Sequence, residues 1–275
     1  MKDELLLNAT GVRRGFGGVT AVDVDHLEVE RGSIIALIGP NGAGKTTFFN
    51  VLTGFERSDA GAWTFDGAEL AGRPAYAIAH AGMVRTFQTA RVFPRLSVVD
   101  NVALAAPGQR GERLASALIP WIWRKQDSEL LEQAKVLVRW VGLEAKGDDY
   151  AGTLSGGQRK LLELARAVMA APRLLMLDEP MAGVNPALRQ SLLEKIKQLP
   201  EEGITVLFVE HDMDVVSAIA DIVVCMAEGR VIASGTPAEV AADPNVIEAY
   251  LGHSRDDLRD MTAEGPEPGS NGAPT

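Results

Sequence analysis

Up to about residue 75 the chain combines two apolar patterns that predict strands and turns, with one short helix between them. Apolar residues partly alternate with polar ones over residues 19–29, which is typical of a half-buried β-strand. Residues 33–38 form a compact apolar run after a turn, and this run predicts a second strand. A glycine-rich loop follows and leads into residues 46–52, for which we expect a helix.

The rest of the chain changes from a mostly helical pattern to an alternation of helices and strands. Apolar residues recur at helical spacing over residues 130–141. Residues 174–177 and 205–209 are short apolar runs bounded by turn residues, which suits strands buried on both faces of a parallel sheet. Residues 223–226 and 230–233 flank a Glu-Gly pair and predict a terminal hairpin.

Composition narrows the class of protein. The chain has 275 residues, 46% of them hydrophobic and 23% charged, enough for one large α/β domain or two small ones. The net charge of −10 argues against a nucleic-acid partner. We interpret the single cysteine, Cys225, as a buried core residue rather than a reactive thiol. Residues 253–275 are rich in Gly, Pro and acidic residues, and we expect them to be disordered.

The glycine-rich loop matches the pattern G-x-x-x-x-G-K-[ST] between a predicted strand and a predicted helix. Glycines let successive amides point at phosphate oxygens, and the helix start adds its positive end. We expect Lys45 to reach the β and γ phosphates and the Thr46 hydroxyl to bind Mg²⁺. A chance glycine turn is the alternative, at about one in a hundred from residue usage. The predicted ATP-binding residues are Gly39, Pro40, Asn41, Gly42, Ala43, Gly44, Lys45, Thr46 and Thr47.

Two neighbouring acids, Asp178 and Glu179, end a predicted apolar strand. Ligands of open α/β sheets gather beyond the carboxyl ends of the strands, so both acids are expected near the phosphate loop. Asp178 suits the Mg²⁺ shell, and Glu179 is a candidate to polarise the attacking water. A solvated strand end is the alternative, but bound Mg²⁺ and nucleotide need acidic ligands.

A second helix start also has features of an anion site. Ser155 is a natural N-cap, and Gly156 and Gly157 leave the first amides of the next predicted helix, residues 159–170, accessible. An ordinary serine cap is the alternative. The motif Leu-Ser-Gly-Gly-Gln, ending at Gln158, precedes the carboxylate strand.

These three motifs, in this order, resemble the ATP-binding cassette family, and the resemblance covers roughly residues 5–252. It implies an α/β fold with a phosphate-loop ATPase core, a mostly parallel sheet and an N-terminal antiparallel part. It further implies a nucleotide-binding domain over residues 1–252 with a smaller helical subdomain at about residues 89–160. In that family ATP lies between one subunit's phosphate loop and the partner's signature residues, which here are Ser155, Gly156, Gly157 and Gln158.

The resemblance implies three further site residues. Phe16 matches an aromatic that stacks on adenine, with a core aromatic as the alternative. Gln88 resembles a glutamine that touches Mg²⁺ or the attacking water and senses the membrane partner, and by itself it is a plain loop residue. His211 resembles a switch histidine that contacts the γ-phosphate, whereas a lone histidine is more often structural.

One position departs from the common family pattern. Asn185 stands where an acid is frequent, so a contact to the partner's phosphate loop is expected to differ. The variant is similar to the branched-chain amino acid importer branch. Residues 85–93, 210–213 and 243–252 point to the same branch.

The resemblance therefore implies an ATP-hydrolysing subunit that powers a membrane transporter and works with a second ATPase subunit. Because no stretch reaches the roughly 18 to 20 apolar residues of a spanning helix, we expect separate permease subunits. The resemblance also implies a separate substrate-binding protein and a location on the inner face of the cell membrane. Residues 88–101, and the apolar stretch 114–123, are candidates for the membrane contact. The alternatives are the motor of a lipid or polysaccharide exporter and a soluble cassette protein acting on ribosomes or DNA.

Overall fold

The computed structural model describes residues 5–86, 92–109 and 120–251, with backbone alone over residues 120–125. Gln88 and the tail 253–275 lie outside the described residues, as does most of the apolar stretch 114–123. The described part contains a four-stranded antiparallel sheet with the strand order β2-β1-β4-β5. Its strands are β1 (Leu5–Phe16), β2 (Val19–Glu30), β4 (Ala60–Phe65) and β5 (Ala68–Glu69).

A six-stranded sheet forms the centre of the fold, with the order β10-β9-β3-β8-β7-β6. Its strands are β3 (Ile34–Ile38), β6 (Met83–Arg85), β7 (Leu174–Asp178), β8 (Thr205–Val209), β9 (Ile222–Ala227) and β10 (Arg230–Gly235). Neighbouring strands from β9 to β6 are parallel, and only β10 runs antiparallel, to β9. The predicted fold class, α/β with a mostly parallel sheet and an antiparallel part, is confirmed.

The central strands are buried on both faces, as the apolar runs predict. Along β3, Ile34, Ala36 and Ile38 belong to one core, whereas Ile35 and Leu37 belong to a second core. The same alternation recurs along β7, β8 and β9. Because side chains alternate across a strand, each of these strands contributes to two cores at once.

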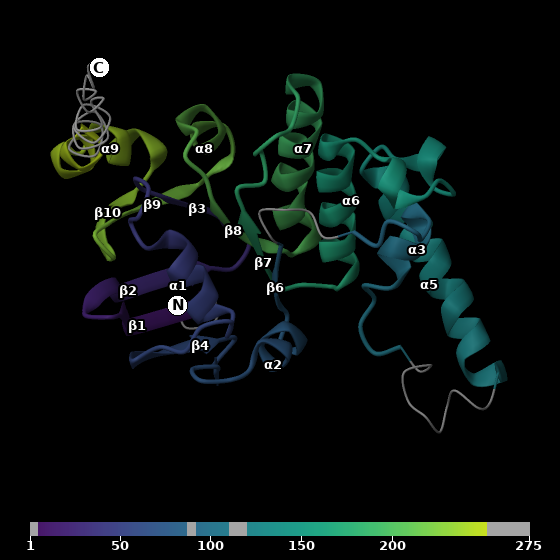
Figure 1. Ribbon diagram of the computed structural model, residues 1–275, viewed down its shortest axis with the longest axis horizontal. Helices are drawn as coiled ribbons and strands as arrows, with labels where there is room; N and C mark the ends of the chain where they lie inside the picture. Colours follow the sequence, from purple (N-terminus) through teal and green to yellow (C-terminus); the bar gives the residue numbers. More distant parts are fainter. Residues whose placement is uncertain (1–4, 87–91, 110–119, 252–275) are drawn as a thin grey trace, which may run out of the picture.

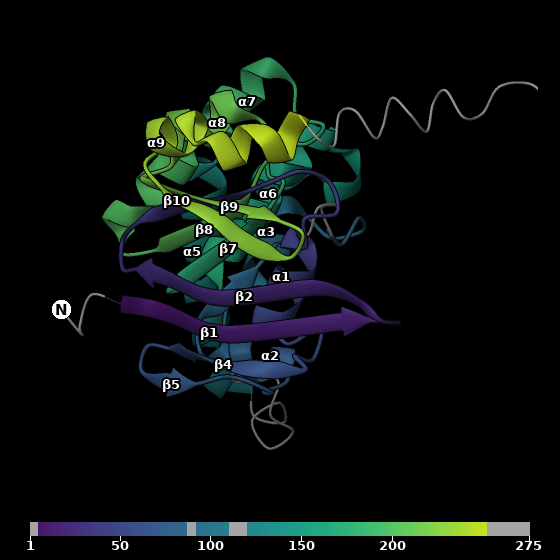
Figure 2. The same ribbon diagram turned by 90° about the vertical axis from the view of Figure 1, so that its left-hand side faces the viewer.

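Different elements cover the two faces of the central sheet. Helix α1 and the antiparallel sheet supply the second core, and helices α3, α5, α6, α7 and α8 supply the first (Figures 1 and 2). The helices are α1 (Lys45–Leu52), α2 (Ala75–His80), α3 (Val98–Ala103), α5 (Pro120–Trp140), α6 (Gly156–Met169), α7 (Pro186–Gln198), α8 (Met213–Ile219) and α9 (Pro237–Ala242). Short 3₁₀ turns are η2 (Glu144–Lys146), η3 (Ala151–Thr153) and η4 (Leu199–Glu202), and residues 244–251 are also helical.

Helices α3, α5 and α6 pack on one another at one end of the molecule (Figure 1). The helical spacing over residues 130–141 identified the second half of α5, which begins earlier, at Pro120. Ala134, Val138 and Val141 are fully buried from this segment. The domain limits, 1–252 and 89–160, stay predictions.

Cys225 is a free, fully buried thiol on β9, as predicted. Burial raises its pKa to about 11, so the thiol is protonated at neutral pH. This agrees with a packing role.

Candidate functional site

The glycine-rich loop connects the buried strand β3 to helix α1 and is held tightly by its surroundings. Gly39 and Gly44 have φ angles of 144° and 94°, which favour glycine. A Cβ atom on Gly39 would lie 2.0 Å from the Met226 carbonyl oxygen, and one on Gly44 would lie 2.2 Å from that of Ala21. The loop therefore touches backbone on both sides, and only residues without a side chain fit at these two positions.

Lys45, the first residue of α1, folds back over the same loop. Its Nζ donates to the carbonyl oxygens of Gly39 (2.6 Å) and Pro40 (2.8 Å). Burial lowers the pKa of the ammonium group, while the charges of Glu179 and Asp178 act in the opposite direction. The predicted cationic and acidic parts of the site thus interact electrostatically.

Asp178 and Glu179 lie where β7 ends. Asp178 is 6% exposed, and its Oδ2 accepts a hydrogen bond of 2.7 Å from a guanidinium nitrogen of Arg85. Glu179 has a φ of 47°, a left-handed conformation that is strained for a residue with a side chain. Its amide donates to the carbonyl oxygen of Val209 on β8 (3.1 Å). A strained backbone persists only where the surrounding structure fixes it, so the Glu179 side chain leaves the chain in a fixed direction.

His211 follows β8, and its side chain is 67% exposed. The residue before it, Glu210, is 1% exposed and accepts hydrogen bonds from the amides of Met181 (3.1 Å) and His211 (3.2 Å). Burial raises the pKa of Glu210, and these hydrogen bonds lower it. Glu210 therefore ties the loop after β7 to the loop that carries His211.

Phe16 ends β1 and is 45% exposed, so a core role is excluded. The Arg14 guanidinium lies over its ring at 4.4 Å from the ring centre. Arg14 is itself held by Asp59 (3.0 Å) and Glu56 (3.2 Å). The aromatic ring is thus accessible and is oriented by a cation–π contact.

The signature residues begin helix α6 and form a capping box. The Ser155 hydroxyl accepts from the Gln158 amide (3.3 Å), and Gln158 Oε1 accepts from the Ser155 amide (3.0 Å). A Cβ atom on Gly157 would lie 2.8 Å from Leu188, so this glycine allows α6 to approach α7 closely. The serine cap is as the sequence predicts.

The structure brings the loop, Lys45 and the two acids together, but it does not bring α6 to them. Helix α1 packs on one face of the central sheet through Phe48 and Phe49, whereas α6 packs on the other through Leu161 and Leu164. Asn185, the departure noted above, caps α7: its side chain accepts from the Leu188 amide at 3.0 Å.

Sequence reasoning missed two polar groups of the site, Arg85 and Glu210, together with Asn50 on α1. Each is a polar residue within or directly after an apolar run of the sequence. That contrast is the signal that was available, because a buried polar residue needs partners. The partners themselves come from distant segments.

A strand, glycine loop and helix with a half-buried lysine, beside two acids at the end of a parallel strand, defines a phosphate-loop ATPase. A family model described as ABC transporter matches residues 22–182, and one described as branched-chain amino acid ATP-binding cassette transporter matches residues 230–256. The chain belongs to the ABC transporter family and is an ATPase.

Proteins that are similar to this chain over most of its length support the assignment to the ABC transporter family. A probable branched-chain amino acid transport ATP-binding protein LivG of Archaeoglobus fulgidus is 40% identical, covering 90% of this chain and 95% of the relative. The high-affinity branched-chain amino acid transport ATP-binding protein BraF of Pseudomonas aeruginosa is 41% identical, and the match covers 90% of this chain and 98% of that protein. A crystal structure of a nucleotide-free ATP-binding cassette from an ABC transporter is 34% identical in sequence and matches with a TM-score of 0.77. The match covers 90% of this chain and 98% of that chain.

Among the described residues, no helix combines the length and the apolar character needed to cross a membrane.

We predict that Gly44→Ala destabilises the fold far more than Gly42→Ala. Both residues have positive φ, but a Cβ atom meets backbone at 2.2 Å from Gly44 and nothing within 4 Å from Gly42. We expect a loss of about 1 kcal/mol at Gly42 from the left-handed conformation alone, and about 3 kcal/mol or more at Gly44. Denaturant unfolding measures both, and equal losses would contradict the close contact.

A second prediction concerns the cap of α7. Asn185→Ala removes the side-chain acceptor for the Leu188 amide and is expected to lower the free energy of unfolding by about 1 kcal/mol. Asn185→Asp keeps an acceptor and serves as the matched control, with little change. Thermal unfolding of both variants distinguishes a capping role from a contact made only to another subunit.

Proposed function

We propose that the chain is the ATP-hydrolysing subunit of a membrane transporter that imports branched-chain amino acids. The observation that carries this proposal is the match of residues 230–256 to the branched-chain model, because this segment lies outside the common ATPase motifs. The names of the relatives support the same cargo class. The match favours this reading over the motor of a lipid or polysaccharide exporter.

ATP binding is assigned to the loop after β3. The N–H groups of Gly39 and of residues 41–44, with those at the start of α1, are assigned as donors to a bound phosphate, and Lys45 turns from the loop carbonyls to the β and γ phosphates. Thr46 and Thr47 complete this end of the site, and Phe16 stacks on the adenine with the face that Arg14 leaves open.

The residues present fit Mg²⁺. Thr46 and Asp178 offer hard oxygen donors, and among the described residues no cluster of three or more acidic, His or Cys side chains forms a separate metal cage. Such a donor set suits an ion bound chiefly by nucleotide phosphates. We therefore assign Thr46 and Asp178 as ligands, with Gln88 as a further contact; the ion would neutralise charge on the phosphates.

Hydrolysis is assigned to the two residues at neighbouring strand ends. Glu179 polarises the attacking water, and its strained backbone holds the carboxylate beyond β7. His211 contacts the γ-phosphate and is kept in place by Glu210 beneath it. Gln88, which comes three residues after the end of β6 in the sequence, is assigned to orient the water or the ion.

A second subunit of the same kind completes the site. In one chain α1 and α6 cover opposite faces of the sheet, so Ser155, Gly156, Gly157 and Gln158 are assigned to the phosphate loop of another copy. The capping box fixes the start of α6, whose positive end suits an anion. The working unit is a dimer with two nucleotides at its interface.

We predict that Glu179→Gln abolishes turnover and accumulates an ATP-bound dimer. Loss of the general base lowers the hydrolysis rate by at least about 100-fold, while the nucleotide contacts remain. Size-exclusion chromatography with light scattering, at saturating Mg²⁺ and ATP, measures the dimer. The double variant Lys45→Ala, Glu179→Gln is the control and is expected to stay monomeric. A monomeric Glu179→Gln variant under these conditions argues against the sandwich.

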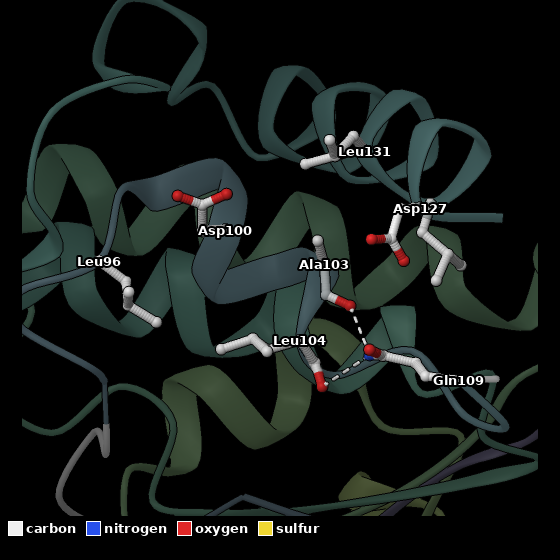
Figure 3. A pocket seen from close by; sticks show the side chains of 8 residues that line it. Leu96, Asp100, Ala103, Leu104, Gln109, Asp127 and Leu131 are labelled. Carbon is white, nitrogen blue, oxygen red and sulfur yellow. Dashed lines mark hydrogen bonds between the residues drawn. The ribbon is translucent and has the colours of Figure 1, made fainter. Parts of the chain in front are cut away.

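Membrane permease subunits are the proposed partners, together with a separate substrate-binding protein, and the chain is placed on the inner face of the cell membrane. The supporting feature is a groove of about 320 Å³ between α3 and α5 (Figure 3). Its lining residues are Leu96, Asp100, Ala103, Leu104, Gln109, Asp127, Leu130 and Leu131. The apolar floor with two acids at its rim suits a short helix carrying apolar and basic side chains. The domain limits 1–252 and 89–160 place this groove in the helical subdomain.

We predict that Leu104→Asp weakens association with the permease. Leu104 is 51% exposed, so the change leaves the free energy of unfolding within about 0.5 kcal/mol. Loss of an apolar anchor lowers co-purification from solubilised membranes by about tenfold. Val136→Asp is the matched control: Val136 is 58% exposed on α5 and does not line the groove. Equal retention of both variants contradicts docking at this groove, and a soluble eluate carrying ribosomal proteins contradicts the transport function.

A further inference from the structure

Arg85 forms a buried ion pair with one of the proposed metal ligands. The side chains of Arg85 and Asp178 are 5% and 8% exposed, and the pair is 2.7 Å long. Their strands β6 and β7 are adjacent and parallel, with Arg85 opposite Met176. A buried charge pair needs good geometry to offset the loss of hydration, so each partner restricts the other to few positions.

The same guanidinium also reaches helix α1. Its other terminal nitrogen donates to Asn50 Oδ1 at 2.6 Å, and its carbon lies 5.6 Å from the centre of the Phe49 ring. Asn50 follows Thr46 by four residues, which places the two side chains on one face of the helix. Arg85 is thus bonded to one proposed metal ligand and to the helical turn directly after the other.

The position of Arg85 in the chain adds a third connection. It is the last residue of β6, and the next residue, Thr86, is bonded through its amide to the Met176 carbonyl oxygen (2.9 Å). The end of β6 therefore carries the group that joins α1 to β7.

We propose that Arg85 is a positioning residue that sets the distance between Thr46 and Asp178, so that these two proposed Mg²⁺ ligands move as one unit. A guanidinium suits this task because its planar fork bonds two partners in fixed directions, whereas an ammonium is a single point charge. This inference rests on the proposed function, because it takes Mg²⁺ and ATP to bind at this site.

The test compares Arg85→Lys with the unchanged protein in two binding measurements. A fluorescent, non-hydrolysable ATP analogue gives the nucleotide Kd in EDTA, and electron paramagnetic resonance of Mn²⁺ with the analogue present gives the metal Kd. We expect the metal Kd to rise about tenfold, as for other groups that orient a metal ligand, with the Kd in EDTA unchanged within about twofold. A metal Kd within twofold of the original overturns the proposal, and so does an equal loss in both measurements.

Two further variants keep the test decisive. Asn50→Ala keeps the ion pair and removes the hydrogen bond from Arg85 to α1, so it is expected to raise the metal Kd by about threefold or more; an unchanged value overturns the proposal even if Arg85→Lys does not fold. Arg173→Lys is the control: Arg173 also bridges elements, donating to the Ala81 carbonyl oxygen (2.6 Å) and stacking on Phe65, but it precedes β7 at the far end. If the unchanged protein binds no nucleotide, the proposed function fails instead.

Discussion

Burial of the central strands on both faces is the constraint on which the rest of the structure depends. A strand that contributes to two cores at once has no free face, so its polar chemistry is confined to its ends. Because β3, β6, β7 and β8 are parallel, their carboxyl ends meet at one edge of the sheet. In the observed register Val209 lies opposite both Leu37 and Asp178. Parallel pairing therefore collects the phosphate loop, the two acids and His211 in one place.

Buried polar groups then hold the collected loops in position. Glu210 accepts hydrogen bonds from backbone amides in two loops. The Arg85 guanidinium donates hydrogen bonds to both α1 and β7. Such groups are stable only when their hydrogen bonds are satisfied, so they tolerate few alternative loop arrangements. The left-handed backbone of Glu179 shows the same principle, because a strained residue persists where its neighbours determine its conformation. The rigidity of the site comes from these contacts rather than from the loops themselves.

The two cores separate the two helix starts that the proposed nucleotide site combines. Helix α6 buries its apolar stripe in the first core, and α1 buries its own in the second. The sheet therefore lies between the two helices in one chain. In the proposed dimer, a composite site at the subunit interface uses both helix starts.

The sequence by itself determined the elements whose signals are local. The apolar run, the glycine loop and the serine cap of α6 depend on neighbouring residues, so their types followed from pattern and turn chemistry. Their limits were less accurate: the strand predicted over 33–38 spans Ile34–Ile38, and the helix predicted over 159–170 spans Gly156–Met169. The motifs that indicate the family are likewise contiguous in the sequence. Only the tertiary structure decided which distant residues meet: that Arg85 bonds Asp178 and Asn50, and that Glu210 ties two loops. Those pairings depend on strand register and on the face from which each helix packs, and neither is encoded in any one stretch of sequence.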